Sequence, residues 1–466
     1  MTVQPRRILV VAYHFPPDAA IGTLRTLRVV RQLAARGHDV TVLTSDPRTY
    51  RPGTPLSDLL TERVPKSVRI VRARAYRSLE ALKRRMQGNA SHRPVATTAA
   101  PAERVSARRR RPHLWRALDA IDATFAIPDQ EAAWLVPAVA RGLLACARWR
   151  PDVVYSSAPA WTGQLVAAAL STALRCPWVA DFRDPWARAP WRGDRFHFVL
   201  RAAAMLERFV VNRADRVVFV SEANRVEFAE HYGPALSSKF EVVRNGCDVT
   251  EFEQVQPVRR PSDRFVLLHA GSLYGGRTPA PLLEALSEAI RDGDIDPQGV
   301  RVRFLGPNAL DDTHATCERL GLGGVVEFVP RVPREEGLLA MASASCLLLL
   351  QPGHSVSVPG KLYEYIATGR PIFAIAEEGE TADVVRRTGF GVSVPPANRG
   401  AIRDALVALC RQGWVEPEPA PRSLYDGAIG ALAIAGILES TVSSRCRAGE
   451  ERRGSEPSAA ERQGVA

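Results

Sequence analysis

The stretch that decides the fold is residues 8–44, which begins with ILVVA (8–12), continues with the loop YHFPPDAAIG (13–22) and ends with DVTVLT (39–44). Its first and last pieces are apolar runs of strand length. Between them, apolar residues recur at helical spacing up to Gly37, where the helix is expected to end. This order predicts a βαβ unit of an open parallel sheet. Such sheets bind ligands beyond the carboxyl ends of their strands, so the loop is expected at a binding site.

The same alternation of strand and helix patterns continues along the chain in two series, separated by a linker at 257–263. The chain is therefore predicted to be an α/β protein with two doubly wound parallel-sheet domains in tandem. Beyond the first unit, strands are predicted at 151–157, 177–182, 215–221, 265–272, 300–306, 325–332, 346–351, 371–376 and 391–394, and residues 241–248 close the first series.

The predicted domains are 1–250 and 251–423, followed by a terminal helix at 424–438. Residues 439–466 are polar and rich in Arg, Glu, Ser and Gly, which predicts a disordered tail.

Composition excludes several classes of protein. The chain has 466 residues, of which 46% are hydrophobic and 24% charged, as in ordinary globular proteins. Its seven Cys are scattered without a CxxC pair, which argues against a disulfide framework or structural zinc and favours a reducing compartment. No signal peptide is recognisable, and the longest uncharged apolar run, 427–438, is shorter than the roughly 20 residues of a membrane span.

The net charge of +12 comes largely from one segment. Residues 63–116 hold 16 Lys or Arg against two Asp or Glu, a surplus of 14. Within it, 77–116 is predicted to be a flexible basic insertion with short amphipathic helices at its ends. Such an arm suits an anionic membrane surface, and a solvated loop remains the alternative. Nucleic acid is disfavoured, because no recognition helix or interleaved stacking aromatics are present.

The most informative motif is VPGKLYEYIATGRP (358–371), in which Gly360 opens a predicted helix. The free N–H groups of its first turn and the cation of Lys361 suit a diphosphate. Glu364 lies on the same face and is placed to accept two hydroxyl protons from a ribose. Only four of the 62 basic residues are Lys, which suggests that Lys361 is required as a point charge. The alternative is a surface Lys–Glu pair.

A second glycine-rich turn, HAGSLYGGRTP (269–279), follows the first strand of the second domain. Gly271 and the glycines at 275 and 276 would let the backbone approach a ligand, and Arg277 would add a cation. Alone this signal is weak, since the glycines can be structural and the GxGxxG spacing is absent. Together with Lys361 it predicts two cations that converge on one anion.

The first domain offers candidates for catalysis in His14 and in the motif DFRDPW (181–186). Asp184 or His14 could meet an acceptor hydroxyl as a base or hydrogen-bond acceptor, and Arg25 and Arg183 are further acceptor-side candidates. A structural Arg183–Asp184 bridge is the alternative. The nine His have no partner at metal-ligand spacing and no GxSxG is present, so metal catalysis and serine hydrolysis are disfavoured.

These motifs, together with LAARGHDVTVLT, ADRVVFVSE and VVRNGCD, resemble those of the family-4 glycosyltransferases over roughly residues 6–412. The resemblance implies the GT-B architecture, in which two Rossmann-like domains face each other across a cleft. It implies a nucleotide-sugar donor bound mainly by the second domain and an acceptor bound by the first, often at a membrane. It also implies transfer with retention of configuration and without a cofactor or essential metal.

Carried over by position, Glu364 matches the second glutamate of the family's paired-glutamate signature, which holds the ribose. Arg277 matches a basic residue near the diphosphate, and Gly22 lies in the loop that closes over it. The chain departs from the pattern at two positions, because Val356 stands where the first glutamate would be and Ser272 where an arginine often follows the glycine. The donor-binding residues expected from motif and resemblance are Gly22, Gly271, Ser272, Arg277, Gly360, Lys361 and Glu364.

The leading expectation is a cytoplasmic enzyme on the inner face of the plasma membrane that transfers a hexose from a nucleotide sugar to a lipid-linked or polysaccharide acceptor. The alternatives are transfer to a soluble small molecule, a nucleotide-sugar epimerase of the same fold, and a non-catalytic basic binding protein.

Overall fold

A computed structural model describes residues 4–51, 54–75, 127–188, 196–253, 255, 264–273, 277–307, 312–353, 355–412 and 425–454. The predicted basic insertion at 77–116 lies outside these residues, as do the glycines at 275 and 276.

The first domain is built on a seven-stranded sheet in the order β3-β2-β1-β4-β5-β6-β7, and every neighbouring pair of strands is parallel. The central strands β4 and β5 are buried on both faces, as expected for a sheet covered by helices on each side. Its strands are β1 (Arg7–Val11), β2 (Asp39–Ser45), β3 (Arg69–Ala73), β4 (Val153–Ala158), β5 (Trp178–Phe182), β6 (Arg216–Phe219) and β7 (Phe240–Val242).

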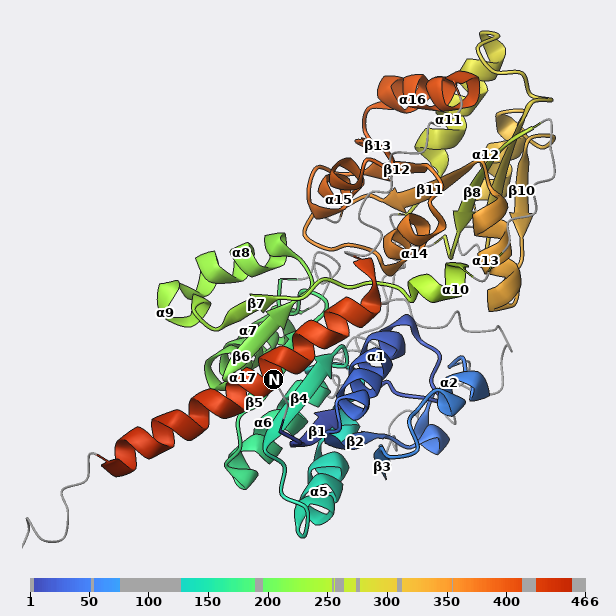
Figure 1. Cartoon of the computed structure of the whole chain (residues 1–466). Coiled ribbons are helices and arrows are strands. Elements are labelled where there is room, and N and C mark those ends of the chain that lie inside the picture. Colours follow the sequence, from blue (N-terminus) through green and yellow to red (C-terminus); the bar gives the residue numbers. More distant parts are fainter. Residues whose placement is uncertain are drawn as a thin grey trace, which may run out of the picture.

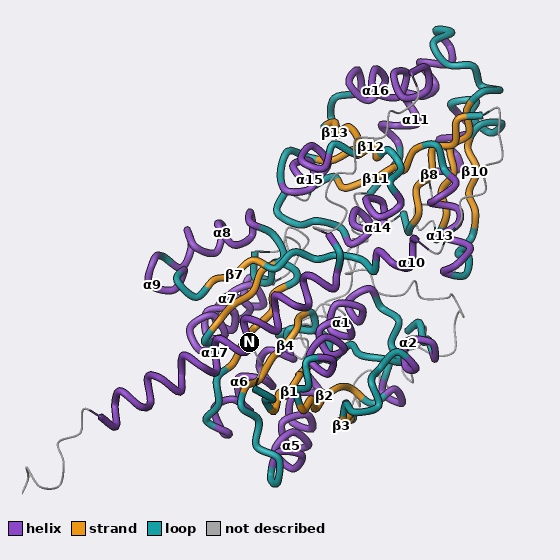
Figure 2. Tube along the Cα trace, in the orientation of Figure 1, coloured by secondary structure: helices purple, strands orange, loops and turns teal. Residues whose placement is uncertain are grey.

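The second domain is built on a six-stranded parallel sheet in the order β10-β9-β8-β11-β12-β13. Figures 1 and 2 show the two sheets in separate lobes of the molecule. The prediction of two parallel-sheet α/β domains is confirmed. The strands of this domain are β8 (Phe265–Ala270), β9 (Val300–Leu305), β10 (Val326–Val329), β11 (Cys346–Gln351), β12 (Ile372–Ala376) and β13 (Gly391–Val394).

The connecting helices run between the strands in both domains, and each domain has its own apolar core. Strand β3 was not predicted, because its sequence RIVRA mixes arginines into the apolar pattern. The helices are α1 (Ile21–Ala35), α2 (Asp58–Glu62), α5 (Leu135–Cys146), α6 (Thr162–Leu174), α7 (His197–Arg213), α8 (Glu222–Tyr232), α9 (Pro234–Ser237), α10 (Val249–Glu253), α11 (Ala280–Arg291), α12 (Thr313–Arg319), α13 (Arg334–Ser343), α14 (Gly360–Thr368), α15 (Glu380–Thr388), α16 (Arg399–Gln412) and α17 (Gly427–Gly454).

The last helix, α17, returns from the second domain and packs against α1 of the first (Figure 1). It continues to Gly454, so the prediction of a helix at 424–438 was too short, and the prediction of disorder was wrong for 439–454. The physical reason is that residues between 439 and 445 find partners on the first domain. Arg36 donates two hydrogen bonds of 2.9 Å to the Glu439 carboxylate, His38 contacts the same group, and Val442 is buried.

Within the described residues, one stretch of helix, Gly427–Arg445 of α17, is long and apolar enough to cross a membrane by length and composition. This stretch is longer than the uncharged apolar run at residues 427–438 that the sequence shows. Several of its side chains are buried against the first domain, including Ile434, Ala435 and Leu438. One face of the helix thus packs on the first domain, while other apolar side chains, Ile429 and Leu432 among them, are exposed.

The loops at the carboxyl ends of the two sheets meet at the domain junction. Ser221, just beyond β6, donates a hydrogen bond of 2.8 Å to the carbonyl of Val356, which follows β11. The amide of Ala223 donates to the Glu380 carboxylate beyond β12 at 3.4 Å. The ligand-binding edges of both sheets therefore face the same junction.

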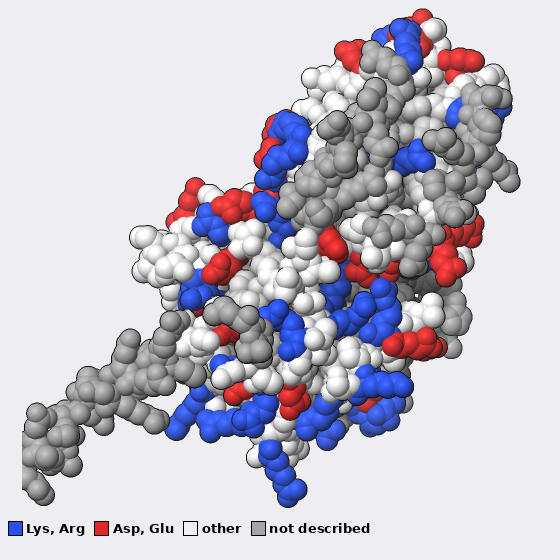
Figure 3. All heavy atoms as spheres, in the orientation of Figure 1, with Lys and Arg blue, Asp and Glu red and all other residues white. Residues whose placement is uncertain are grey.

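Surface arginines gather at the end of the first domain that lies away from the domain junction, where the strands of its sheet begin. A pocket of about 280 Å³ there is lined by the amino ends of β1 and β4 and by the end of α6. Figure 3 shows Lys and Arg side chains concentrated along this edge of the lobe. The arginines that line the pocket are Arg6, Arg7, Arg150, Arg175 and Arg445.

Candidate functional site

The helix α14 presents the residues of the PGKLYEY motif to the junction. Pro359 precedes its first turn and no side chain caps it, so the first N–H groups have no side-chain acceptor. Its buried face includes Tyr365, whose hydroxyl accepts from the Ala270 amide at 2.9 Å and lies 3.3 Å from the Leu348 carbonyl. These contacts fix the helix against β8 and β11.

Lys361 reaches the carboxyl end of β8, where its ammonium group donates to the Ala270 carbonyl. Gly271 comes next, with a φ of +152° that disfavours any side chain, and a Cβ atom there would overlap the Lys361 ammonium. The glycine therefore makes room for the lysine. The contact joins the two motifs that the sequence analysis linked.

The electrostatic surroundings of Lys361 combine two arginines with one carboxylate. Burial is the main cause that lowers its pKa, to about 8, and the charges of Arg277 and Arg331 act in the same direction, while Glu364 opposes them. A site with several cations that destabilise one another favours an anion. Arg277 and Lys361 thus lie in the same positive region, as predicted, and Arg331 is an additional cation that the sequence did not reveal.

His269 at the end of β8 belongs to the same region. Burial, with the nearby charges of Lys361 and Arg277, lowers its pKa to about 3, so the ring is neutral. Its Nδ1 lies 3.0 Å from the Leu348 carbonyl, and its buried Nε2 has no hydrogen-bond partner among the described residues. Next to it, the amides of Gly271 and Leu273 on either side of Ser272 donate to the carbonyls of the last residue of β9 and of Pro307 just beyond it, which holds the turn in place.

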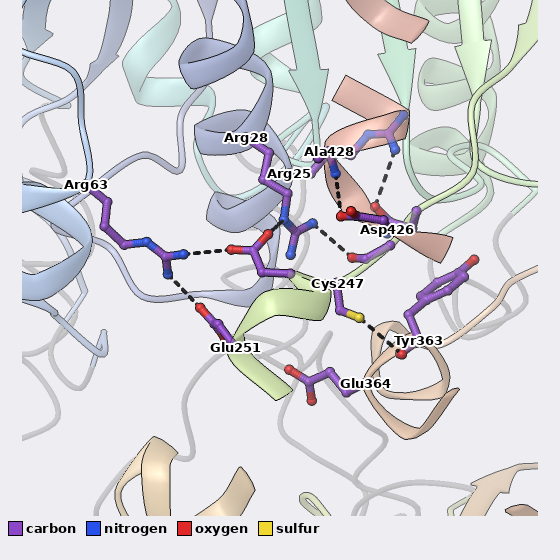
Figure 4. Close-up of polar contacts among 12 residues, drawn as sticks. Arg25, Arg28, Arg63, Cys247, Glu251, Tyr363, Glu364, Asp426 and Ala428 are labelled. Carbon is purple, nitrogen blue, oxygen red and sulfur yellow. Dashed lines mark hydrogen bonds and ion pairs between the residues drawn. The ribbon is translucent and has the colours of Figure 1, made fainter. Parts of the chain in front are cut away.

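Glu364 lies one turn along α14 from Lys361 and is partly exposed. Its Oε1 accepts a hydrogen bond of 3.0 Å from Arg334 at the start of α13, and Arg334 in turn binds Glu251 of α10. Figure 4 shows Glu364 beside α10 at the connection between the domains. The structure thus brings Lys361, Arg277 and Glu364 together, and their roles in ligand binding stay predictions.

Val356, at the position of the family's first glutamate, serves as a contact between the domains. Its carbonyl accepts the hydrogen bond from Ser221, whose hydroxyl also accepts from the Asn224 amide to cap α8. This contact uses the backbone carbonyl, and the apolar side chain of Val356 supplies no carboxylate at this position.

In the first domain, His14 has an acidic partner that the sequence analysis missed. Its Nδ1 lies 2.5 Å from the carboxylate of buried Asp18, which also accepts from the Ala20 amide. A carboxylate at Nδ1 holds the ring with Nε2 available as an acceptor, the arrangement that general bases use. The spacing of four residues was the available signal.

Asp184 is largely buried beyond β5, and burial raises the pKa of its carboxyl group, against the effect of Arg183. The alternative of an Arg183–Asp184 bridge is wrong. Arg183 instead donates to the carbonyls of Ala158, Pro159 and Gly22 at 2.8, 2.9 and 2.6 Å. A Cβ atom on Gly22 would lie 2.6 Å from this guanidinium group, so Gly22 is needed for that contact.

The structure gives Arg25 and Arg183, the predicted acceptor-side candidates, partners within the protein itself. Arg25 is 5% exposed and forms two hydrogen bonds of 2.9 Å with Asp181. Its remaining donors bind the carbonyls of Val243 and Arg244. Because both guanidinium groups are occupied by the protein's own oxygens, we assign them structural roles.

Comparisons with known proteins agree with this architecture. Residues 22–246 match the model of the glycosyl transferase 4-like domain, and residues 264–412 match that of the glycosyl transferases group 1. A D-inositol 3-phosphate glycosyltransferase of Nocardioides is 31% identical over 43% of this chain and 47% of its own length. A D-inositol 3-phosphate glycosyltransferase of Streptomyces bingchenggensis is 28% identical over 41% of this chain and 44% of its own length. The matched region thus spans about half the length of these relatives.

The fold agrees with solved structures over nearly the whole chain. The structure of HepE from Anabaena in complex with UDP superposes with a TM-score of 0.55 at 16% identity, covering 96% of this chain and 100% of that one. At this identity the likeness shows the fold alone. The two family models together cover most of the chain, in the order that its two parallel-sheet domains require, and the chain belongs to the family-4 glycosyltransferases with the GT-B architecture.

Proposed function

We propose that this protein transfers a hexose from a nucleoside diphosphate sugar to an acceptor hydroxyl. The observation that carries the proposal is the convergence of Lys361 and Arg277 at the open start of α14, with Glu364 on the same helix. Cations and helix N–H groups in this arrangement suit a diphosphate, and the carboxylate suits the adjoining ribose. The structure of HepE with UDP gives a precedent for a nucleotide on this fold.

In the proposed reaction, the bond between the anomeric carbon and the β-phosphate oxygen breaks, and its electron pair remains on the diphosphate. The acceptor oxygen forms the new bond to that carbon and loses its proton. Lys361 and Arg277 stabilise the negative charge that grows on the leaving group. We propose retention of configuration, with the acceptor on the same face of the sugar as the leaving diphosphate, which takes up the proton. His14, oriented by Asp18, and Asp184 are then the candidates that bind the acceptor hydroxyl as hydrogen-bond acceptors before its proton passes to the diphosphate.

We also propose that transfer needs no metal ion, because Lys361 and Arg277 supply positive charge at the diphosphate. Among the described residues, no group of three or more His, Cys, Asp or Glu is placed to hold a metal. Full activity in EDTA would support this part of the proposal, and restoration by added Mg²⁺ would contradict it.

The first test is nucleotide binding followed by transfer. Ligands that bind the native state raise its melting temperature, so UDP, GDP and ADP can be screened by thermal shift. Radiolabelled sugars of the nucleotide that binds are then incubated with membrane lipid extract. A stabilising nucleotide and a labelled product support the proposal. No shift with any nucleotide would count against it, and isomerised free donor would indicate an epimerase.

Binding is expected to weaken as the pH rises through about 8, the lowered pKa of Lys361 in the free protein. Below this pH the ammonium is charged and attracts the diphosphate, whereas above it the proton must be taken up on binding. The Kd for the nucleotide should therefore rise by up to about tenfold per pH unit above 8. Calorimetry between pH 7 and 9.5 checks this. The variant Lys361→Arg, which stays charged, should bind independently of pH in this range.

We further propose that the acceptor is lipid-linked or part of a surface polysaccharide, and that the protein works on the cytoplasmic face of the plasma membrane. The support in the described residues is an apolar stripe on α7. Phe198, Met205 and Phe209 are 42%, 74% and 50% exposed, and their spacing places them on one face of the helix. Arg201 and Arg208 lie beside them and are exposed. Apolar side chains flanked by arginines suit an anionic bilayer.

Replacing Phe198, Met205 and Phe209 together with serine is expected to reduce binding to vesicles that contain anionic phospholipid by about tenfold or more. Co-sedimentation measures the bound fraction. The matched control replaces the exposed Leu59 and Leu144, which lie on other helices, with serine. Equal binding of the triple variant and the wild type would contradict a role of α7. If the wild type bound zwitterionic vesicles as well as it binds anionic ones, a role of charge in membrane binding would be contradicted.

A second candidate acceptor is a soluble cyclitol phosphate, which the named activity of the two inositol 3-phosphate glycosyltransferases favours. The two candidates differ in their need for lipid. Full turnover with inositol 3-phosphate in lipid-free buffer would support the second, and activity only with lipid extract would support the first.

A further inference from the structure

A continuous chain of six alternating charges joins the first domain to Glu364. It comprises Arg28, Asp248, Arg63, Glu251, Arg334 and Glu364, and we call it the ion-pair chain. Its N···O distances in this order are 2.5, 2.8, 2.7, 2.7 and 3.0 Å. Each carboxylate between two arginines binds both of them.

The members of the ion-pair chain come from both domains and from their connection. Arg28 is on α1 and Arg63 directly follows α2, both in the first domain. Asp248 and Glu251 belong to the connection between the domains, where Asp248 directly precedes helix α10 and Glu251 lies within it. Figure 4 shows Arg63 extending from the first domain to Glu251, with Glu364 on the other side of α10.

Arg334 is the member that reaches Glu364. Its Nε and Nη2 donate to Glu251 Oε2 at 3.1 and 2.7 Å, and its Nη1 donates to Glu364 Oε1 at 3.0 Å. The planar guanidinium group thus holds two carboxylates at a fixed relative position. The two negative charges also raise the pKa of Arg334 above its usual value despite burial. A carboxylate has about four acceptor positions, so Glu364 keeps acceptor capacity for ribose hydroxyls.

We propose that Arg334 is a positioning residue that orients Glu364 toward the nucleotide ribose, and that Glu251 and Arg63 hold Arg334 in place. The first domain then contributes to nucleotide recognition without contacting the nucleotide. This inference rests on the proposed function, in which Glu364 binds the ribose.

A purely structural role predicts something different. Partly exposed ion pairs contribute about 0–1 kcal/mol to stability, so their loss alone would change the melting temperature little and would not alter ligand selectivity. A positioning role predicts that variants lose the part of the nucleotide affinity that comes from the ribose hydroxyls and keep the rest. The two roles are therefore separated by comparing nucleotides with and without these hydroxyls.

The experiment measures the Kd of UDP and of 2′,3′-dideoxy-UDP by calorimetry, or of the corresponding pair for GDP or ADP if one of these gives the larger thermal shift. The wild type is expected to prefer the ribonucleotide, and Glu364→Gln to lose that preference. Arg334→Gln should reduce the preference by about tenfold, as expected for a hydrogen bond to a charged group, while binding of the dideoxy form stays within about twofold. Arg63→Gln should act in the same direction by a smaller factor.

The matched control is Arg303→Gln, which breaks another Arg–Glu pair of the second domain, 2.7 Å long and partly exposed, with Glu327. This variant should keep the wild-type preference. Absence of nucleotide binding by the wild type would defeat the proposed function itself. Equal affinity of the wild type for both nucleotides would defeat the ribose role of Glu364. A preference lost in Glu364→Gln but kept in Arg334→Gln would overturn the positioning role, and an unchanged Arg63→Gln would overturn its extension to the first domain.

Discussion

Replacing Lys361 with alanine is expected to lower kcat/KM for the sugar donor by about 10²–10³-fold, the usual effect of removing one electrostatic contact to a developing negative charge. The ammonium group lies at the open start of α14 with Arg277 and Arg331 nearby. Its contribution grows in the transition state, because the charge on the diphosphate increases as the glycosidic bond breaks. The loss should therefore appear in kcat as well as in KM.

Two further variants separate the charge of Lys361 from its placement. Lys361→Arg keeps the charge, but the larger guanidinium group has to fit against Gly271 and the Ala270 carbonyl, so an intermediate activity is expected. Gly271→Ala keeps the lysine but places a Cβ atom on its ammonium group, so it should reduce activity nearly as much as Lys361→Ala. Steady-state kinetics with the labelled donor measures all three. Negligible effects of all three would show that Lys361 serves only its contact with the Ala270 carbonyl.

The fold was predictable because its signals are local. Strand-length apolar runs such as residues 8–12 and 346–351 are buried on both faces of a parallel sheet, and the glycines that end their helices follow at the expected spacing. The strand β3 and the extension of α17 were not predicted, because the signals for them are not local. Their polar residues are stabilised by partners far away in the sequence, such as Arg36 and His38 for Glu439.

The candidate site was predictable only in part. The motif around Lys361 and Glu364 and the turn at Gly271 lie at strand ends, and the topology of a parallel sheet brings such ends together. Asp18 could have been found from its spacing to His14. Arg334 and Glu251 could not, because they join Glu364 through contacts that span 30 and 83 residues. For the same reason Arg25 and Arg183 looked available to a ligand in the sequence, although the fold surrounds them with oxygens.

Replacing the buried Arg25 with alanine is expected to destabilise the first domain by about 3–5 kcal/mol. Asp181 would keep only the hydroxyl groups of Tyr155 and Ser157, at 2.8 and 3.1 Å, and its buried charge would have no cation hydrogen-bonded to it. The carbonyls of Val243 and Arg244, just before the domain connection, would also lose their donor. The matched control is Arg36→Ala, which breaks the partly exposed pair with Glu439 and should cost about 1 kcal/mol or less.

The free energy of unfolding of this domain can be followed by tryptophan fluorescence, since all Trp residues except Trp414 precede residue 250. The decisive comparison uses Asp181→Asn, which removes the charge but keeps the shape of the side chain. In the wild-type background this change breaks the ion pair and should destabilise the domain. In the Arg25→Ala background it removes an unpaired buried charge and should stabilise it, because an uncompensated charge costs more than a neutral amide. If Asp181→Asn destabilises both backgrounds equally, the two residues are not coupled, and the effect of Arg25 comes from its bonds to the backbone instead.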